Sequence, residues 1–220
     1  LQHLIDQITG LLRHSTARGQ REALAGVLTE ASTLAGWVSL DRNAVSQAWN
    51  HYERAKDAAR EAGSTAMLAH AFAEQAFVLI DIDENRHAVE QLEHARALGA
   101  DHVSPLLQAW LSAAAGEGFA AFGQSDAALT AFDDATHLLP NAPQDPTLPF
   151  LFLGDSHLDR WRGNALAKVG DLGAVDQLAA ALPRLPKAFV RARVGMMVDL
   201  AYAHAAAGNR DEAQTYARQA

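Results

Sequence analysis

Histidines and carboxylates at helical spacing are the residues of this sequence that could do chemistry. His87, Glu90 and His94 would lie on one face of a helix, and two imidazoles with one carboxylate can bind zinc. His87 and His94 are nearly two helical turns apart, about 10 Å along the axis, which is too far for both to reach one ion comfortably. We therefore interpret this group as a solvated outer helix face and predict no metal site.

A second group, Asp155, His157 and Asp159, stands near a predicted helix start. Carboxylates there interact favourably with the helix dipole, so capping explains them without a catalytic acid. The sequence has no H-E-x-x-H, G-x-S-x-G, P-loop or G-x-G-x-x-G motif, and it has no cysteine for a disulfide, thiolate site or nucleophile. We predict that the chain is not an enzyme and uses no cofactor. An α-helical enzyme is kept as an alternative.

Composition and charge limit the partners. Of the 220 residues, 49% are hydrophobic and 20% are charged, as in a globular protein. The net charge of −8 repels phosphates, so we predict no direct nucleic-acid contact. No run approaches roughly 18 consecutive apolar residues and no basic leader is visible, which predicts no membrane contact and a cytoplasmic location. Because the chain begins at Leu1 rather than Met, we expect either a piece of a longer protein or a chain that has lost its start.

A repeat of forty residues organises the chain. Gly36 is followed at offsets of 12, 16 and 19 by Ala48, Tyr52 and Ala55, and the same pattern returns forty and eighty residues later. Small residues recur at the first, second and fourth places, and a large apolar residue recurs at the third. The copies are Ala76, Ala88, Leu92 and Ala95; Gly116, Ala128, Phe132 and Ala135; a looser Gly163, Ala174 and Leu178; and Ala201, Ala213, Ala217 and Ala220, with a small third residue.

Small residues at matched intervals let two antiparallel helices approach to roughly 8–10 Å. The large residue is predicted to fill the space between one helix pair and the next. Because one pair cannot bury its apolar face alone, successive pairs stack, and the many alanines favour helix over strand. The sequence therefore predicts an all-α fold, a right-handed α-solenoid of about five helix hairpins.

Turn residues give the predicted boundaries. Gly123, Gly170 and Gly208 can supply the left-handed residue that ends a helix, and Asn43, Ser125 or Asn209 can cap the next one. Helices are expected near residues 1–17, 20–38, 43–62, 65–80, 85–98, 104–122, 125–138, 155–169, 172–182, 187–207 and 210–220. The predicted organisation is one repeat domain over residues 1–220, with an N-terminal helix at 1–18 and helix pairs at 20–62, 65–98, 104–138, 155–182 and 187–220.

A proline-rich loop at residues 139–152 interrupts the period. Its prolines, which prevent regular structure, are Pro140, Pro143, Pro146 and Pro149. One interpretation is a plain linker between repeats. The other, because long loops inside compact domains are often functional, is a lid that closes on a bound molecule through Leu148, Phe150 and Phe152.

Two segments resemble tetratricopeptide repeats. Residues 163–171 (GNALAKVGD) resemble half of such a repeat, and residues 207–213 (AGNRDEA) resemble its turn. Leu34-Ala35-Gly36-Trp37 followed by Tyr52, with a period nearer 40 than 34, is similar to the C-terminal sensor regions of actinobacterial regulators that carry an Xre-type helix-turn-helix. This resemblance implies a tetratricopeptide-like groove that binds a peptide, a small signalling molecule or a partner protein and controls a DNA-binding head absent from this chain.

Residues 35–49 have a texture like a helix-turn-helix, AGWVS followed by VSQAW. One interpretation is a DNA-recognition helix, and the other is the turn and second helix of the first repeat. The second is favoured, because the same small-residue register recurs forty and eighty residues later without that texture, and the acidic charge disfavours DNA.

The tetratricopeptide resemblance implies that the first helix of each pair lines a concave groove. A helical wheel places on that face Glu30, Thr33 and Trp37; His70, Glu74 and Phe77; Trp110, Ala113 and Glu117; His157, Arg160, Trp161 and Asn164; and Val198, Asp199 and Tyr202. Aromatics mixed with isolated polar groups are typical of ligand pockets, although each aromatic can equally be core. The predicted ligand-binding residues are Trp37, His70, Glu74, Phe77, Trp110, Glu117, His157, Arg160, Trp161, Asn164 and Tyr202.

Arg160 and Asn164, one helical turn apart, are the predicted anchors for a carboxylate or an extended peptide backbone. The functions considered are a sensor of a transcriptional regulator, a protein–protein scaffold or adaptor without a small ligand, and an α-helical enzyme. A homodimer is a further expectation, since operators are commonly two-fold. The apolar stripe of the first helix either caps the first repeat or forms a partner interface; it comprises Leu1, Leu4, Ile5, Ile8, Leu11 and Leu12.

Overall fold

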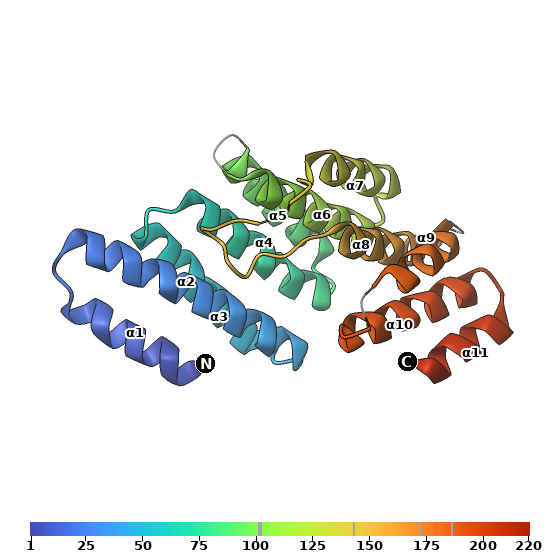
Figure 1. The fold of residues 1–220 in the computed structure, drawn as a ribbon, viewed down its shortest axis with the longest axis horizontal. Coiled ribbons are helices and arrows are strands. Elements are labelled where there is room, and N and C mark those ends of the chain that lie inside the picture. Colours follow the sequence, from blue (N-terminus) through green and yellow to red (C-terminus); the bar gives the residue numbers. More distant parts are fainter. Residues whose placement is uncertain (101–102, 143, 172, 186) are drawn as a thin grey trace. The chain divides into compact units, whose positions relative to one another are not determined.

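The computed structural model describes residues 1–100, 103–142, 144–171, 173–185 and 187–220. These residues form eleven α-helices, one short 3-10 helix and no strand (Figure 1), which confirms the all-α prediction. The helices are α1 (Gln2–His14), α2 (Arg18–Asp41), α3 (Val45–Glu61), α4 (Thr65–Asp81), α5 (Asn85–Gly99), α6 (Pro105–Ala121), α7 (Ser125–Leu138), α8 (Asp155–Lys168), α9 (Gly173–Ala181), the 3-10 helix η1 (Leu182–Arg184), α10 (Val190–Ala206) and α11 (Arg210–Gln219).

The chain divides into two compact units. Unit 1 comprises residues 1–111 and 144–152, and unit 2 comprises residues 112–143 and 153–220. The division falls within α6, whose first residues belong to unit 1 and whose remainder belongs to unit 2. The sequence predicted one repeat domain over residues 1–220, and this stays a prediction. Pro143 and position 172, where the ninth helix was predicted to begin, lie outside the described residues.

Consecutive helices pack in pairs because a large side chain of the second helix lies on a glycine of the first. A Cβ atom added to Gly36 would lie 2.7 Å from the ring of Tyr52, and one added to Gly116 would lie 2.6 Å from the ring of Phe132. The forty-residue register is therefore structurally equivalent at these positions. Tyr52 lies on the glycine of its own pair and also reaches the next pair, as predicted, because it shares a buried cluster with Val78 of α4 and donates to Glu74 of α4 at 3.1 Å.

The turns between helices share one backbone geometry. Asn43, Asp83 and Gly123, forty residues apart, have positive φ angles of 57°, 62° and 79°. The following N–H donates to a carbonyl five residues earlier each time, at 2.9, 2.9 and 2.8 Å, which is the Schellman geometry of a helix end. Gly63, Gly170 and Gly208 occupy the same kind of position.

This geometry corrects the predicted caps. Asn43 is the left-handed residue after α2, so α2 extends to Asp41 rather than to residue 38. Ser125 already lies inside α7, and Asn209 makes no side-chain capping bond. Ser64 does cap α4, by accepting from the backbone N–H of Met67 at 3.3 Å.

Replacing Gly123 by alanine is expected to lower the free energy of unfolding by about 1 kcal/mol, because a Cβ is disfavoured in the left-handed conformation. Replacing Asp83 by glycine at the equivalent turn should raise it by up to about 1 kcal/mol for the same reason. Urea denaturation of both variants measures the difference. A destabilised Asp83→Gly protein would contradict the shared turn geometry.

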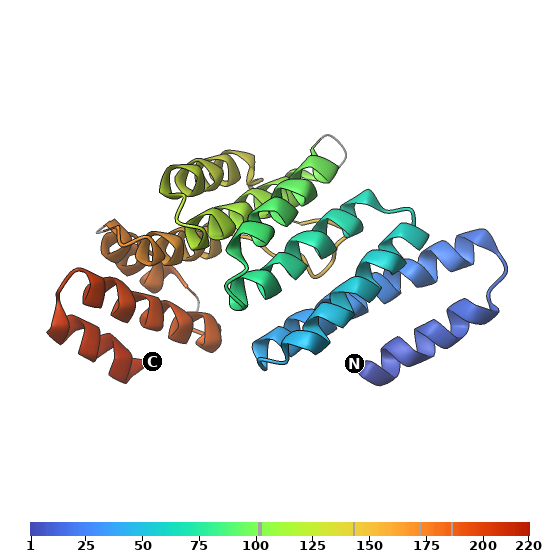
Figure 2. The same cartoon turned by 180° about the vertical axis from the view of Figure 1, so that it is seen from behind.

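The N-terminal helix caps unit 1. Figure 2 shows α1 as the darkest blue helix, which begins at the N-terminus. Ile5 and Ile8 of α1 are buried in a cluster with Leu28 of α2 and Ala58 of α3. Ser15 has an extended backbone, so α1 ends at His14 rather than at residue 17. Arg21 of α2 donates to the carbonyls of Leu12 at 2.8 Å and Ser15 at 3.0 Å beside this helix end. The other half of the stripe, Leu1, Leu4 and Leu11, is exposed.

One of the described helices, α2, is long and apolar enough to cross a membrane by length and composition. Half of the matching window (50%) is buried inside the protein. The sequence prediction of no membrane segment had considered unbroken apolar runs and missed this helix. Its packing against α1, α3 and α4 accounts for the apolar composition.

Candidate functional site

The histidines singled out for metal chemistry are engaged locally. His87 Nδ1 lies 2.9 Å from a carboxylate oxygen of Glu84, with both side chains exposed, and the ring of His94 packs edge-on against Phe72 at 4.9 Å. Asp159 accepts from Gln177 at 2.9 Å, which joins α8 to α9. Within the described ranges, no three His, Asp or Glu side chains form a group that could hold a metal ion.

In unit 1, predicted residues from α4 and α6 come together around Trp110. This side chain is buried, 5% exposed, and its ring centroid lies 4.8 Å from that of His70 and 6.4 Å from that of Phe77. His70 Nε2 is 3.6 Å from Glu74 Oε1, and the other carboxylate oxygen, Glu74 Oε2, accepts a hydrogen bond from the Tyr52 hydroxyl at 3.1 Å. We call His70, Glu74, Phe77 and Trp110 the unit 1 cluster.

The carboxylates near this cluster are electrostatically linked. Burial raises the pKa of Glu30, His70 opposes the rise, and the charges of Asp145 and Glu74 add to it. Burial and the neighbouring Glu74 carboxylate also raise the pKa of the Tyr52 hydroxyl, which therefore stays a hydrogen-bond donor. Neither Glu30 nor Tyr52 was among the predicted ligand residues, although the helical wheel placed Glu30 on the predicted face.

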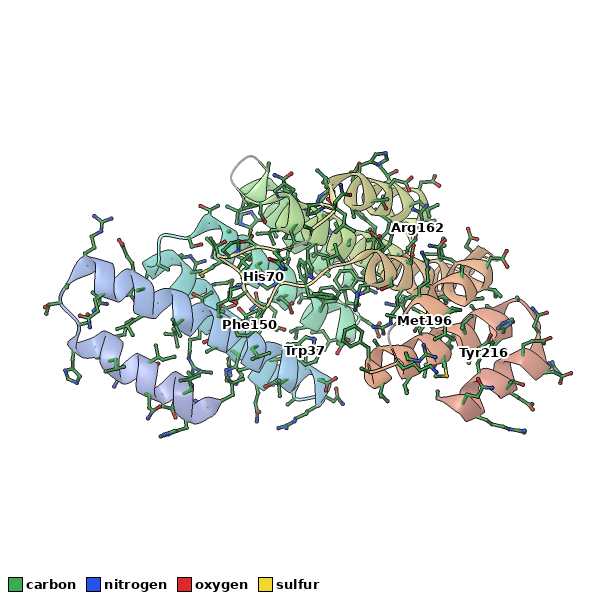
Figure 3. The ribbon with its side chains drawn as sticks, viewed as in Figure 1. Trp37, His70, Phe150, Arg162, Met196 and Tyr216 are labelled. Carbon is green, nitrogen blue, oxygen red and sulfur yellow. The ribbon has the colours of Figure 1, made fainter. Side chains whose placement is uncertain are left out.

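The proline-rich loop contributes to unit 1 as well. Residues 144–152 pack as part of this unit, and in Figure 1 they cross α4 as a thin yellow to orange trace. Leu148 is 1% exposed, whereas Phe150 and Phe152 are 67% and 56% exposed. Phe150 belongs to unit 1 with His70 and Trp37, and Figure 3 labels all three side chains. Of the three residues predicted to close on a ligand, Leu148 instead fills the interior of the protein.

In unit 2, four charged residues and one asparagine from α6, α8 and α10 form a second group. Lys168 of α8 donates to Glu117 of α6 at 2.9 Å, and Asn164 of α8 donates to Asp199 Oδ1 of α10 at 2.7 Å. Arg160 Nε lies 3.7 Å from Asp199 Oδ2. We call Glu117, Arg160, Asn164, Lys168 and Asp199 the unit 2 cluster.

Two atoms of the unit 2 cluster keep unused hydrogen-bonding capacity. Arg160 Nε and Asp199 Oδ2 are buried, and neither has a hydrogen-bond partner among the described residues. Their separation of 3.7 Å is too long for a hydrogen bond between them. Asp199 is 8% exposed, and burial raises its pKa against the lowering effects of Asn164, Arg160 and Lys168.

A glycine on α10 leaves room beside the unit 2 cluster for the guanidinium of Arg160. A Cβ atom added to Gly195 of α10 would lie 2.6 Å from an Arg160 nitrogen. Val198 and Tyr202 follow on the same helix and are 39% and 71% exposed. On α8, burial and the charge of Arg160 lower the pKa of His157, whose ring lies 5.9 Å from that of Phe189. Asp199, one member of the buried polar pair, thus lies on a helix that also presents the exposed side chains of Val198 and Tyr202.

No protein-family model and no curated protein matches the chain. Among solved structures, BtubC (BKLC) from P. vanneervenii superposes with a TM-score of 0.67 at 14% identity, covering 99% of this chain and 85% of that one. The nearly identical TPR-like repeats of a Podosopora anserina kinesin light chain-like protein give 0.57 at 16% identity, covering 89% and 93%. The fold is a tetratricopeptide-like α-solenoid.

A third tetratricopeptide-like structure is the Rap conjugation gene regulator of plasmid pLS20 in complex with the Phr* peptide. It has a TM-score of 0.62 and 17% identity over 93% of this chain, which spans 55% of that regulator. At these identities the likeness establishes the fold alone. It confirms the tetratricopeptide part of the sequence resemblance, while the Xre-type regulator part stays a prediction.

Seen as tetratricopeptide-like pairs, the first helices carry both clusters. The predicted residues His70, Glu74, Phe77 and Trp110 meet in unit 1, and Glu117, Arg160 and Asn164 meet in unit 2. Trp37 (45% exposed) and Tyr202 lie at the surface, and Trp161 is half-buried. Asp199, which contacts Asn164 and Arg160, was not among the predicted ligand residues, although its position three residues before Tyr202 on the predicted face was the available signal.

Proposed function

We propose that this chain is a regulatory module that binds an extended peptide or a protein segment through the first helices of its tetratricopeptide-like pairs. The observation that carries the proposal is the unit 2 cluster. In this cluster, Arg160 Nε of α8 and Asp199 Oδ2 of α10 are buried without a hydrogen-bond partner among the described residues, and α10 also presents Val198 and Tyr202 to solvent. Buried polar groups are normally paired, so this pair is suited to a ligand that completes it.

A peptide group has the chemistry that this pair requires. Its N–H can donate to Asp199 Oδ2, and its C=O can accept from Arg160 Nε. Asn164 fixes the other carboxylate oxygen of Asp199, and Gly195 leaves room for the guanidinium, so both groups are held before a ligand arrives. Exposed Val198 and Tyr202 can cover apolar side chains of the same peptide, and tyrosine is frequent among binding hot spots.

In the finer form of the proposal, the chain is the sensor part of a cytoplasmic transcriptional regulator whose DNA-binding head lies outside this sequence. Support comes from the sequence resemblance to Xre-type regulators and from the fold likeness to a regulator solved with a peptide. A peptide or a small signalling molecule would be the signal, and homodimerisation would match a two-fold operator. An adaptor without a small ligand uses the same face, and the binding experiment separates the two.

The test selects linear heptapeptides from a random phage-displayed library on immobilised protein and measures their binding by fluorescence anisotropy. A selected peptide should lose at least about tenfold in affinity with Arg160→Met, because a charge-assisted hydrogen bond contributes roughly 1.5–3 kcal/mol. Arg162→Met is the matched control. Arg162, which Figure 3 labels, lies two residues further along α8. It pairs with Asp133 of α7 at 2.6 Å and is not part of the unit 2 cluster.

Equal affinities of the two variants would refute the role of the unit 2 cluster. If no short peptide is enriched over bare support, the sensor form is wrong and a folded partner protein, as for an adaptor, becomes the ligand to seek.

A further inference from the structure

The loop 139–152 differs from the other inter-helix connections. The Schellman turns are short connections between neighbouring helices. The loop 139–152 instead connects α7 to α8, which both belong to unit 2, while its residues 144–152 pack as part of unit 1. We call residues 144–152 the docked segment.

Burial in the docked segment repeats every third residue. Asp145, Leu148 and Leu151 are buried (8%, 1% and 6% exposed), and the described residues between them are exposed. Two successive turns produce this spacing, with Leu148 N–H donating to the Asp145 carbonyl at 3.1 Å and Leu151 N–H donating to the Leu148 carbonyl at 2.9 Å. Pro146 and Pro149 stand at the second position of each turn, where proline is favoured. The segment therefore directs three anchors to one side.

The first anchor is recognised by a specific contact. Ser104 Oγ donates to Asp145 Oδ2 at 2.5 Å and also accepts from the Leu107 N–H at 3.2 Å, so Asp145 lies at the N-terminus of α6, where a negative charge is favourable. The other oxygen, Asp145 Oδ1, accepts from the backbone N–H and hydroxyl of Thr147 at 2.8 and 2.6 Å. The segment thus organises its own turn, accepts a hydrogen bond from Ser104 through Asp145, and buries Leu148 and Leu151 as part of unit 1.

We propose that the docked segment is an internal ligand, and that the surface of unit 1 beside Ser104 is a docking site for extended segments with the pattern Asp-Pro-x-Leu-Pro-x-Leu. The reasoning is that the segment carries its own turn structure, is joined to unit 2 at both ends, and reaches unit 1 through three regularly spaced anchors. A partner segment with the same pattern competes with it for the site. The proposal concerns unit 1 and does not depend on the peptide site proposed in unit 2.

The test adds a fluorescein-labelled nonapeptide, Gln144–Phe152, to two full-length proteins. The wild-type chain should bind it weakly, because its own segment is present at an effective concentration on the order of millimolar. A chain carrying Asp145→Ala, Leu148→Ser and Leu151→Ser should bind it at least about tenfold more tightly by anisotropy. A control peptide with Asp145→Ala should bind neither protein. Equal binding by both proteins, or no binding to a released chain that circular dichroism shows to be folded, would overturn the proposal.

If the triple variant fails to fold, the single substitution Ser104→Ala in the otherwise unchanged chain tests the same proposal. Hydrogen exchange should then accelerate at the Leu148 and Leu151 amides and stay unchanged in α2, α3 and α4. Acceleration throughout unit 1 would show that the segment is an integral part of its core, and no acceleration at the two leucines would show that Ser104 does not hold it. Either result contradicts an internal ligand.

Discussion

Replacement of Gly116 by valine is expected to lower the free energy of unfolding by about 3 kcal/mol, because overpacking a tight helix crossing typically costs about 1–3 kcal/mol and a branched side chain lies at the upper end. A Cβ atom at this position would lie 2.6 Å from one ring carbon of Phe132 and 2.8 Å from another. Neither α6 nor α7 can yield without opening the pair. Thermal unfolding should show a Tm lower by about 6–12 °C, from about 2–4 °C per kcal/mol in a chain of this size.

Gly10→Val is the matched control. Gly10 also lies within a helix, α1, but a Cβ atom there has nothing within 4 Å, so its replacement should be nearly neutral. Phe132→Ala, which removes the opposing ring, should destabilise the wild-type chain yet cost less in the Gly116→Val background, because the two changes share one contact. Strict additivity of the two substitutions would contradict the proposed crossing.

Replacement of Lys168 by methionine is expected to destabilise unit 2 by about 1–3 kcal/mol near neutral pH. Removing one partner of a buried ion pair costs about 3–5 kcal/mol, and the figure is reduced here because the Lys168 side chain is 42% exposed and partly screened by water. Glu117 would be left buried without the ammonium group that now lies 2.9 Å from it.

The effect should depend on pH with a defined sign. Burial raises the pKa of Glu117 above its ordinary 4.5, while Lys168 lowers it. Between the unfolded and the raised folded pKa, the native state holds more protons than the unfolded state, so stability falls as pH rises through this window. Loss of Lys168 raises the folded pKa further and widens the window. The destabilisation should therefore be largest above the folded pKa and shrink below the unfolded value.

Urea denaturation of the wild-type and Lys168→Met proteins, repeated across this pH range, measures the difference. Glu117→Gln supplies the control, because a neutral amide of the same shape should remove the pH dependence of the Lys168→Met effect. A Lys168→Met effect that is the same at all pH values would mean that Glu117 is not the titrating group.

The sequence was sufficient for the helix pairs and their register. Gly36 with Tyr52 and Gly116 with Phe132 are local pairs, because each pair lies on two consecutive helices joined by one short connection. Their spacing in the sequence is therefore enough to predict that they meet. The left-handed turns were harder to predict, since Asn43 and Asp83 replace the glycine found at Gly123. An Asn or Asp can serve either as a helix cap or as a left-handed residue, and its type alone does not distinguish the two roles.

For the candidate sites, helical periodicity indicated which residues share one face of a helix but not which side chains of other helices they contact. Arg160, Asn164 and Asp199 were placed on that face by their spacing, whereas the 2.7 Å bond between Asn164 and Asp199 joins residues 35 positions apart. Trp110 and Tyr202 had the same sequence signal, yet one is 5% and the other 71% exposed. The neighbouring helices decide this difference, and an isolated helix carries no information about them.

By itself, the sequence determined an all-helical chain of paired helices, because small residues, large residues and turn residues act on neighbours within one hairpin. The tertiary structure decided which polar groups are paired and that residues 144–152 pack into unit 1, because these outcomes depend on side chains brought together from distant helices. Ser104 and Asp145, 41 residues apart and joined at 2.5 Å, are such a pair.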